Sequence, residues 1–477
     1  MSWIDFTDQF KIKLKASFDG GLTWSEASTV VHVEEGYTSA DPSISFNAAG
    51  DVFVCFIDFT GTEPPVTGGV YVSKSTDGGL SWGLPSEVIT TSYDGSKWPI
   101  DRPWIEIDKS GGIYDGTIYI SSMNLNRDNP PFRPYLSVSN DGGSTFTTTY
   151  LDTEDWYAGS INPLPLCSPT LNSNGDFYGS YPSYVITQSP YAQVFLAKST
   201  TAGADFSHQK IITHTDPTNL SDYPSAKKAS LLRSDPSDPM HLAFLYLSAT
   251  SGDLDIYLTE SYDEGENWTA AVRINDDPLG NDKMQDLLWA DFDEDGDLIV
   301  SWRDRRNGRS GTYETSSEIW AAFRDKDALA FSPNFQITNT SVVYDTILAS
   351  AGNDFMCIKI QNDTINATWG DTRDGRLNIW FQSMRTDGTV LSVQKIASDQ
   401  IPKIVVYPNP TNSIINIGCE QLNKIHIFDT KGTLILVKEN TKGTKIMQVD
   451  LSSYPAGNYI IEAETSNEIF TEKIVKY

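Results

Sequence analysis

Short apolar runs separated by polar turns make up most of this chain. Residues 52–57 (VFVCFI), 118–121 (IYIS) and 298–302 (LIVSW) are examples, and glycine, aspartate or asparagine residues lie beside each of them. Runs of this length between such residues are typical of β-strands joined by tight turns. Few segments show the 3.6-residue spacing of an amphipathic helix. The pattern predicts an all-β protein.

One turn motif occurs four times. SFDGGLTW begins at Ser17, STDGGLSW at Ser75, SNDGGSTF at Ser139 and SYDEGENW at Ser261. An aspartate in a tight turn can accept backbone N–H bonds, a glycine can take positive φ, and an aromatic residue can cover the turn. We therefore expect four hairpin tips, in which the aspartates have a structural role before any role in ligand binding. These aspartates are Asp19, Asp77, Asp141 and Asp263.

The spacing of the motif predicts the architecture. Successive copies begin 58, 64 and 122 residues apart, and a degenerate unit, STTAGADF from Ser199, lies in the long gap. Two further degenerate units begin at Phe323 and Ser383, which gives seven hairpins over about 390 residues. A repeat of about 60 residues with four strands in each unit is typical of a β-propeller.

Two counts of the blades remain open. Six strand pairs lie between the hairpins, for example DPSISFNAAGDVFVCFID from Asp41, and they would form the inner half of each blade. No such pair precedes the first hairpin. Either this N-terminal hairpin completes the last blade of a six-bladed ring, or the ring has seven blades and the first one is incomplete.

Composition limits the class of partner. The formal net charge of −28 makes nucleic acid a poor partner, because binding a polyanion relies on Lys and Arg. No apolar run is long enough for a transmembrane segment. The four cysteines and five histidines show no zinc-type spacing, so we expect no zinc cofactor, and the cysteine pairing stays open.

The last 75 residues change in character and predict a separate small β-sandwich. We place the propeller at residues 1–391, a linker at 392–402 and this domain at 403–477. The domain resembles the C-terminal sorting domain (Por domain) of type IX secretion cargo, and the alternative is a generic Ig-like adhesive module. The resemblance rests on Tyr407-Pro408-Asn409-Pro410, the turn Phe428-Asp429-Thr430-Lys431-Gly432, residues Leu451 to Tyr459 and the terminal Lys473-Ile474-Val475-Lys476.

This resemblance implies a partner and a location. Cargo of this kind crosses the periplasm of a Gram-negative bacterium and is handed to the type IX machinery, so we expect a secreted or outer-surface protein. Such cargo needs an export signal, and residues 1–6 have neither a basic stretch nor an apolar core. Because the inner half of a first blade is missing at the same end, we expect that the start of the chain is truncated.

The propeller resembles the Asp-box (BNR repeat) sialidase superfamily, through its four turn motifs and their spacing. The resemblance implies a site on one face of the ring. In sialidases this site holds three arginines that bind the sugar carboxylate, a tyrosine nucleophile paired with a glutamate, and an aspartate acid/base. Forked guanidinium groups match a carboxylate in two-point contact, and a neutral nucleophile is not repelled by it.

Position within each unit predicts which residues reach that face, because the start of strand one and the end of strand two emerge there. The candidates for substrate binding are Arg102, Arg303, Arg373, Asp304 and Asp371. The candidates for catalysis are Tyr344 as nucleophile and Asp58 or Asp101 as acid/base, with a glutamate partner left open between Glu314 and Glu318. The family's arginine ahead of the first turn motif has no counterpart, since no arginine precedes Arg102.

Each site residue also has a structural reading. An aspartate lies beside each of the three arginines, so an Asp/Arg network that braces neighbouring blades explains the same pattern, and a tyrosine that begins a strand is more often a packing residue. On the opposite face, Asp291, Asp293 and Asp295 imitate the first half of an EF-hand. The twelfth position of that loop is Trp302 rather than Glu, so we expect a plain acidic turn rather than a calcium site.

The sequence thus predicts a secreted sialidase-like propeller, as a glycoside hydrolase acting on sialylated or other glycans. The alternative is a non-catalytic propeller that binds a glycan or a protein at the cell surface, and a third reading is a purely structural surface protein. The turn motif cannot choose among them, because unrelated Asp-box families share the turn without sharing the chemistry.

Overall fold

The structure is a computed structural model, and it describes residues 1–7, 9–125, 132–152, 166–185, 187–214, 230–309, 315–343, 356–397, 405–418, 422–441, 443–444, 446–465 and 469–477. The described residues form β-strands and no helix, as the sequence predicts. The chain divides into two compact units, Met1–Ala397 and Ser398–Tyr477, and each is described by itself.

Unit 1 is a succession of antiparallel sheets, and in each four-stranded sheet the strands are paired in chain order. The first sheet has three strands, β1 (Ser2–Asp5), β2 (Lys11–Leu14) and β3 (Ser28–Thr29). Two sheets follow: β4 (Thr38–Phe46), β5 (Val52–Phe59), β6 (Gly68–Ser75), β7 (Ser86–Thr90); and β8 (Ile100–Ile107), β9 (Ile118–Asn124), β10 (Tyr135–Ser139), β11 (Thr147–Tyr150).

Four more sheets of the same form complete the unit. They are β12 (Ser168–Leu171), β13 (Phe177–Ser183), β14 (Gln193–Ser199), β15 (Ser207–Thr213); β16 (Ser230–Ser234), β17 (Leu242–Ser248), β18 (Asp255–Ser261), β19 (Val272–Arg273); β20 (Gln285–Phe292), β21 (Leu298–Asp304), β22 (Glu318–Arg324), β23 (Phe335–Gln336); and β24 (Cys357–Gln361), β25 (Thr364–Asp371), β26 (Asn378–Arg385), β27 (Val390–Ala397).

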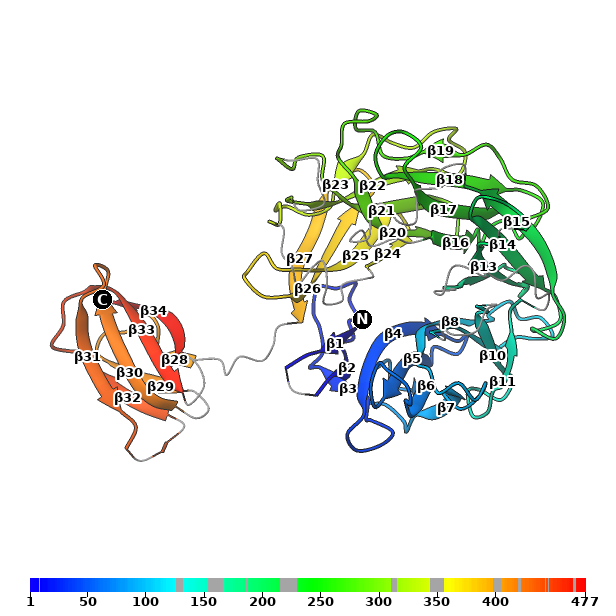
Figure 1. The fold of residues 1–477 in the computed structure, drawn as a ribbon. Helices are drawn as coiled ribbons and strands as arrows, with labels where there is room; N and C mark the ends of the chain where they lie inside the picture. The colour runs from blue at the N-terminus through cyan, green and yellow to red at the C-terminus, as the bar shows by residue number, and fades with distance from the viewer. Residues whose placement is uncertain are drawn as a thin grey trace. The chain divides into compact units, whose positions relative to one another are not determined.

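These sheets follow one another around a ring, with the first strand of each nearer the middle and the last strand outside (Figure 1). The N-terminal hairpin forms its own sheet and does not join β24–β27, which already has four strands. It lies between that sheet and β4–β7. The ring of Trp24 stands edge-on to Phe381 of β26 at 5.1 Å between centroids, and Ile12 and Leu14 pack with Val54 of β5.

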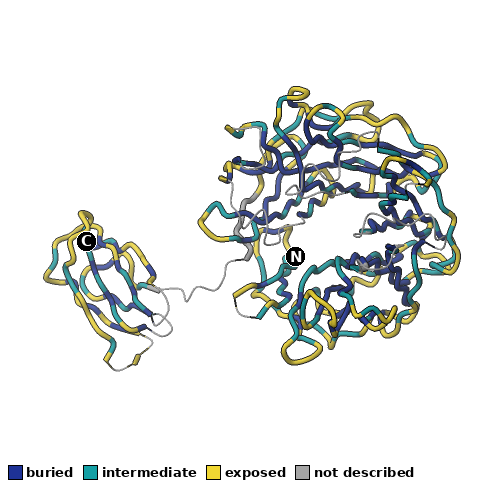
Figure 2. Tube along the Cα trace, viewed as in Figure 1, coloured by how far each residue is buried: buried dark blue, intermediate teal, exposed yellow. Residues whose placement is uncertain are grey.

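The hydrophobic core lies between neighbouring sheets rather than in one central mass, and Figure 2 shows the buried positions along the strands. Cys55 and Val70 of one sheet pack with Ile105 and Ile118 of the next. Burying a Val, Leu or Ile side chain is worth about 1.5–3 kcal/mol. Each sheet is therefore held mainly by its two neighbours, which explains why strands such as β5 and β21 are buried on both faces along almost their whole length.

Strand β27 continues past residue 391, where the sequence places the start of a linker. Its backbone pairs with β26 as far as Ala397, opposite Ile379. Within this strand, Leu391 to Gln394 alternate apolar and polar residues, as an outer strand of a sheet does. The linker predicted at 392–402 thus begins inside this strand.

Unit 2 holds two sheets around one core. The three-stranded sheet contains β28 (Val405–Tyr407), β29 (Ile414–Gly418) and β32 (Ile446–Asp450). The other sheet contains β31 (Leu434–Glu439), β30 (Leu422–Asp429), β33 (Gly457–Thr465) and β34 (Ile469–Lys476). Ile415 and Val449 of the first sheet pack with Ile427 and Ile461 of the second, so the two layers share a single core.

Candidate functional site

Three buried aspartates occupy the same place in three sheets. Asp58, Asp304 and Asp371 lie at or next to the end of β5, β21 and β25, the second strand of each sheet, and are 0%, 0% and 4% exposed. The sequence places all three on the functional face of the ring. Each carboxylate is held by hydrogen bonds from nearby side chains, and these bonds decide what the residue can do.

Asp304 belongs to a brace with Trp302 and Arg306. The indole Nε1 of Trp302 donates to Oδ2 of Asp304 at 2.7 Å, and Nε of Arg306 donates to the same oxygen at 3.0 Å. The Arg306 guanidinium lies 4.1 Å from the ring centroid of Trp320 on the neighbouring strand, in cation–π contact. Burial raises the pKa of Asp304, and the contact with Arg306 opposes that rise.

Asp371 belongs to the same brace in the next sheet. Trp369 Nε1 donates to Asp371 Oδ2 at 2.7 Å, Arg373 donates to both carboxylate oxygens, and the Arg373 guanidinium lies 4.5 Å from the centroid of Trp380. The counterpart of Arg373 is therefore Arg306. The two sheets repeat a Trp-x-Asp-x-Arg pattern whose members lie two residues apart, on one side of the strand.

Arg303 lies on the other side of its strand. Its Nε donates to Asp286 Oδ1 at 2.7 Å and its Nη2 to Asp286 Oδ2 at 2.5 Å, while Arg305 Nη1 reaches the same carboxylate at 3.0 Å. Burial alone would raise the pKa of Asp286, but the two guanidinium groups hold it well below its usual range. Arg303 is 4% exposed, so a free carboxylate would have to displace Asp286 to reach it in this way.

One small cavity brings several candidates together. Arg303, Glu318, Trp369 and Asp371 line it, and its volume is about 20 Å³. Such a space holds about one water molecule and no sugar ring. Glu318 is itself occupied, since its Oε2 accepts from Asn307 Nδ2 at 3.1 Å and from Trp320 Nε1 at 3.2 Å.

Asp58 lies in a cluster with His32 and Ser39. Its Oδ1 is 2.9 Å from His32 Nδ1 and 2.8 Å from Ser39 Oγ, and its Oδ2 accepts from the backbone N–H of Val33 at 2.8 Å. Ser, His and Asp are the members of a hydrolase triad, but a triad serine contacts Nε2 while the aspartate holds Nδ1. Here Ser39 Oγ lies 3.1 Å from Nδ1, so the geometry is not that of a triad.

Asp101 and Arg102 lie at a β-bulge in β8. Arg102 has φ of 49°, and its backbone N–H bonds to Asp101 Oδ1 at 2.8 Å. The inner strands β4 and β20 have the same irregularity, at Asp41 with φ of 50° and Leu287 with φ of 54°. Bulges change the direction of side chains and are common beside functional sites.

The remaining candidates are distributed elsewhere. Tyr344 and Glu314 lie outside the described residues. In the turn motifs, Asp141 Oδ2 accepts the hydroxyl of Thr145 at 2.6 Å, and Asp141 Oδ1 accepts the N–H of Thr145 at 2.9 Å and the hydroxyl of Ser139 at 2.8 Å. These bonds lower the pKa of Asp141 to about 2. Asp19, Asp77 and Asp263 make the same two kinds of bond.

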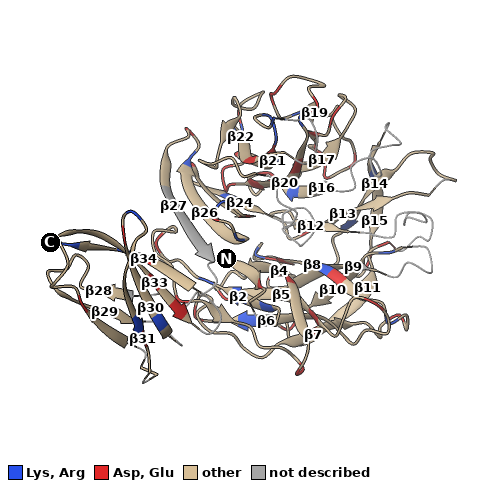
Figure 3. Cartoon of the chain, turned by 60° about the vertical axis from the view of Figure 1, so that its left-hand side comes forward, with Lys and Arg blue, Asp and Glu red and all other residues tan. Residues whose placement is uncertain are grey.

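The acidic loop has other partners than a metal. Asp291 pairs with Lys359 at 2.6 Å, and Asp293 Oδ1 accepts the backbone N–H groups of Asp295 and Asp297 at 3.0 and 2.9 Å. Figure 3 shows the acidic and basic segments close together around β20 and β24. Across the described ranges there is no group of three or more His, Cys, Asp or Glu side chains placed to hold a metal ion. Cys55, Cys167 and Cys357 are unpaired thiols, and Cys419 lies outside the described part.

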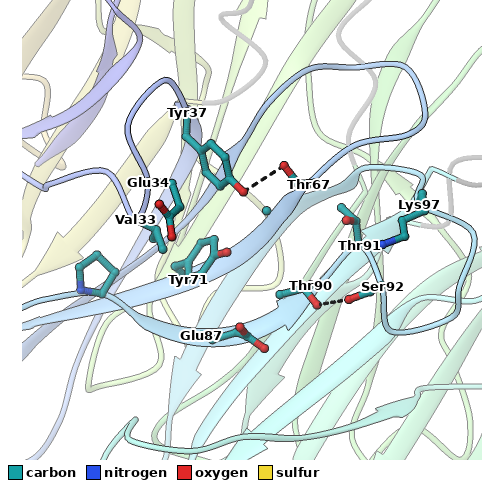
Figure 4. A pocket seen from close by; sticks show the side chains of 12 residues that line it. Val33, Glu34, Tyr37, Thr67, Tyr71, Glu87, Thr90, Thr91, Ser92 and Lys97 are labelled. Carbon is teal, nitrogen blue, oxygen red and sulfur yellow. Dashed lines mark hydrogen bonds between the residues drawn. The ribbon is translucent and has the colours of Figure 1, made fainter.

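A second hollow, which the sequence did not indicate, lies on the sheet β4–β7. It is a groove of about 490 Å³ between residues 33–37, the strands β6 and β7, and the segment after β7 (Figure 4). Its lining includes Glu34, Tyr37, Tyr71, Glu87 and Lys97. The signal that could have indicated it is weak, because these residues come from four separate stretches of the chain.

Several solved structures are similar to this chain. The Hadza microbial sialidase Hz136 is 11% identical, with 80% of this chain and 74% of that chain covered and a TM-score of 0.46. A Penicillium chrysogenum α-L-arabinanase is 14% identical, with 81% of this chain and 99% of that chain covered and a TM-score of 0.48. A protein of unknown function from Dyadobacter fermentans is 14% identical, with 76% of this chain and 95% of that chain covered and a TM-score of 0.45. No curated protein matches in sequence.

In the described residues, no helix has the length and apolar character to cross a membrane. Residues 405–477 match the family model of the secretion system C-terminal sorting domain, which confirms the predicted sorting domain and indicates secretion through the type IX system.

Proposed function

We propose that this chain is a secreted, sialidase-like β-propeller that binds glycans at the cell surface and does not cleave sialosides. In this proposal the ring has seven blades, the first of which is the three-stranded sheet β1–β3, and unit 2 is an Ig-like sandwich that directs export. The matched sorting domain supports the secreted location. The resemblance of the turn motifs to the Asp-box superfamily supports a carbohydrate ligand.

One observation supports binding rather than sialidase chemistry. Two of the three arginines that would bind a sugar carboxylate are already paired with aspartates of the protein, Arg303 with Asp286 and Arg373 with Asp371. A ligand carboxylate would have to break a buried, two-point ion pair to take the place of either aspartate, and separating such a pair costs about 3–5 kcal/mol. The cavity beside Arg303 is also too small for a sugar.

A second candidate function is a glycoside hydrolase of the same family. The cavity that brings Arg303, Glu318 and Asp371 together favours it, since an arginine and two carboxylates are the residue types that such chemistry uses. In that reading Tyr344 is the nucleophile, Asp58 or Asp101 the acid/base, and Arg102, Arg303 and Arg373 bind the substrate.

An assay of the full-length protein on fluorogenic sialosides separates the two functions. We expect no fluorophore release above the blank from the wild type, from Arg303→Ala or from Tyr344→Phe. Release by the wild type that both substitutions abolish, while circular dichroism shows both variants folded, would establish the hydrolase. Release that neither substitution changes would place a catalytic site elsewhere and would reject both assignments.

A further inference from the structure

The groove on the sheet β4–β7 has the form of a small-molecule site. Its volume of about 490 Å³ falls within the range of ligand pockets, and it is separate from the cavity at Arg303. At the edge of the groove, Gly68 allows β6 to lie close to the backbone of β5. A Cβ at Gly68, which has φ of 104°, would lie 3.0 Å from the Tyr37 ring and 2.2 Å from the carbonyl oxygen of Asp58.

Tyr71 is the central residue of the groove. Its side chain is 5% exposed, and its ring packs in the core with Val54 and Phe56. Its hydroxyl points into the groove (Figure 4) and has no hydrogen-bond partner among the described residues. The ring is buried but the hydroxyl opens onto the groove, so it can exchange water for a hydroxyl of a ligand there.

The groove offers both acceptors and donors. Glu34 and Glu87 bring carboxylates near Tyr71, and Lys97 brings an ammonium group on the far side (Figure 4). None of these three has an ion pair or side-chain hydrogen bond within the described ranges. Tyr37 donates its hydroxyl to Thr67 Oγ1 at 3.0 Å, which fixes its ring beside the opening.

This combination selects a class of ligand. Carboxylates only accept hydrogen bonds and an ammonium group only donates, so a ligand that satisfies both must carry groups that do both, as hydroxyls do. An anionic ligand is disfavoured by Glu34, Glu87 and a net charge of −28. A purely cationic ligand would be repelled by the ammonium group of Lys97 and would offer it no hydrogen-bond acceptor.

We propose that this groove binds a neutral oligosaccharide, with hydroxyl groups between Glu34, Glu87 and Lys97, the Tyr71 hydroxyl as an anchor, and the Tyr37 ring against an apolar face of a sugar. The inference rests on the proposed function for the choice of saccharides, and it adds a site and a ligand class. The site lies on the sheet β4–β7, and Arg102, Arg303 and Arg373 are not among its lining residues.

Isothermal titration calorimetry of the full-length protein with a panel of neutral oligosaccharides tests this. The probes are the linear hexaoses of glucose, xylose and mannose, with sialyllactose as the anionic probe and spermine as the cationic probe. Tyr71→Phe removes only the anchoring hydroxyl and Glu87→Gln only a charge. We expect each to raise the Kd of a bound neutral probe about 3- to 10-fold. Tyr246→Phe on β17 and Glu294→Gln in the acidic loop are controls, and we expect no change in Kd.

Each outcome bears on the proposal. Binding of a neutral probe that Tyr71→Phe and Glu87→Gln weaken, and the controls do not, supports it. Binding that both groove variants leave unchanged overturns the groove while the proposed glycan-binding function stands. Binding of spermine or sialyllactose alone overturns the ligand class. If the wild type binds no glycan, both the groove proposal and the proposed glycan-binding function are overturned. If the wild type cleaves a sialoside, the proposed function is overturned, and the Kd values of the groove variants still test the groove.

Discussion

The Arg303 guanidinium and the Asp286 carboxylate form a two-point ion pair across β20 and β21, with Nε–Oδ1 at 2.7 Å and Nη2–Oδ2 at 2.5 Å. Both side chains are almost fully buried. A pair of this kind restricts what can enter beside it, because either partner left alone is a buried charge. The ion pair therefore stabilises this part of the ring, and it also opposes binding of a ligand carboxylate by Arg303.

The first prediction concerns this pair. Arg303→Ala leaves the Asp286 carboxylate with Arg305 alone, so we expect the free energy of unfolding to fall by about 3 kcal/mol or more. The triple variant Arg303→Met/Arg305→Met/Asp286→Leu removes all three charges that meet here, and we expect it to be more stable than Arg303→Ala. Urea unfolding at pH 7 measures both. A loss below about 1 kcal/mol for Arg303→Ala would contradict a buried structural pair.

The same pair predicts a pH dependence. The pKa of Asp286 is lowered in the folded protein by Arg303 and Arg305, so its contribution to stability is present above the unfolded pKa of 3.8. That contribution is lost as the pH falls below this value. Stability of the wild type should therefore decline in acid more steeply than that of Arg303→Met/Arg305→Met/Asp286→Leu, as thermal unfolding at pH 2.5–6 would show.

The sequence indicated the ring but not this pair, for a physical reason. The turn motifs could be recognised because their bonds are local: the carboxylate of Asp141 binds the N–H four residues later. Asp286 and Arg303 are 17 residues apart in sequence, and their meeting depends on the register of β20 on β21, which includes a bulge. No local pattern determines that register.

The alternation of side chains along a strand could have corrected the prediction that Arg303 and Arg373 occupy equivalent positions. Trp302, Asp304 and Arg306 lie two residues apart and share a side, as do Trp369, Asp371 and Arg373. Comparison of these two segments pairs Arg373 with Arg306, whereas Arg303 lies on the other side. His32 and Ser39 beside Asp58 had no such signal, because a loop and the pairing of β4 with β5 bring them together.

The second prediction concerns His241, which lies between two carboxylates. Its Nδ1 is 2.9 Å from Asp235 and its Nε2 is 2.8 Å from Glu260, which also pairs with Arg324, and the Tyr262 ring stacks on it at 4.5 Å. Burial opposes the charge, but hydrogen bonds to Asp235 and Glu260 outweigh burial and raise the pKa of His241 to about 9.

Because the folded pKa is raised, this histidine contributes stability that is complete below its unfolded pKa of 6.5 and is lost as the pH rises through about 9. The contribution is about 3 kcal/mol by linkage. We expect urea midpoints of the wild type to fall between pH 6.5 and 9.5, and those of His241→Gln to fall less over the same range. Parallel curves for the two proteins would show that His241 is neutral when folded.

The third prediction tests how the N-terminal sheet closes the ring. A Cβ on Gly21 would lie 2.3 Å from the Phe381 ring of β26, whereas a Cβ on Gly20 would meet nothing within 4 Å. Both glycines have positive φ, at 85° and 70°, so alanine is strained at either position by about 1–2 kcal/mol. Gly21→Ala should cost about 1–3 kcal/mol more than Gly20→Ala because of the overpacking. Equal melting temperatures for the two variants would place Phe381 elsewhere.

The last prediction concerns the boundary between the two units. The core of unit 2 consists of its own strands, so we expect residues 1–397 to fold without it and to show the melting temperature of unit 1 in the full chain. A chain that ends at residue 391 lacks the part of β27 in which Ser392 to Ala397 pair with β26, and it leaves backbone groups of that strand without partners. Its melting temperature should be lower. Scanning calorimetry of the full chain, 1–397 and 1–391 makes the comparison. If 1–391 and 1–397 melted together, β27 beyond residue 391 would contribute nothing, and the linker would begin where the sequence places it.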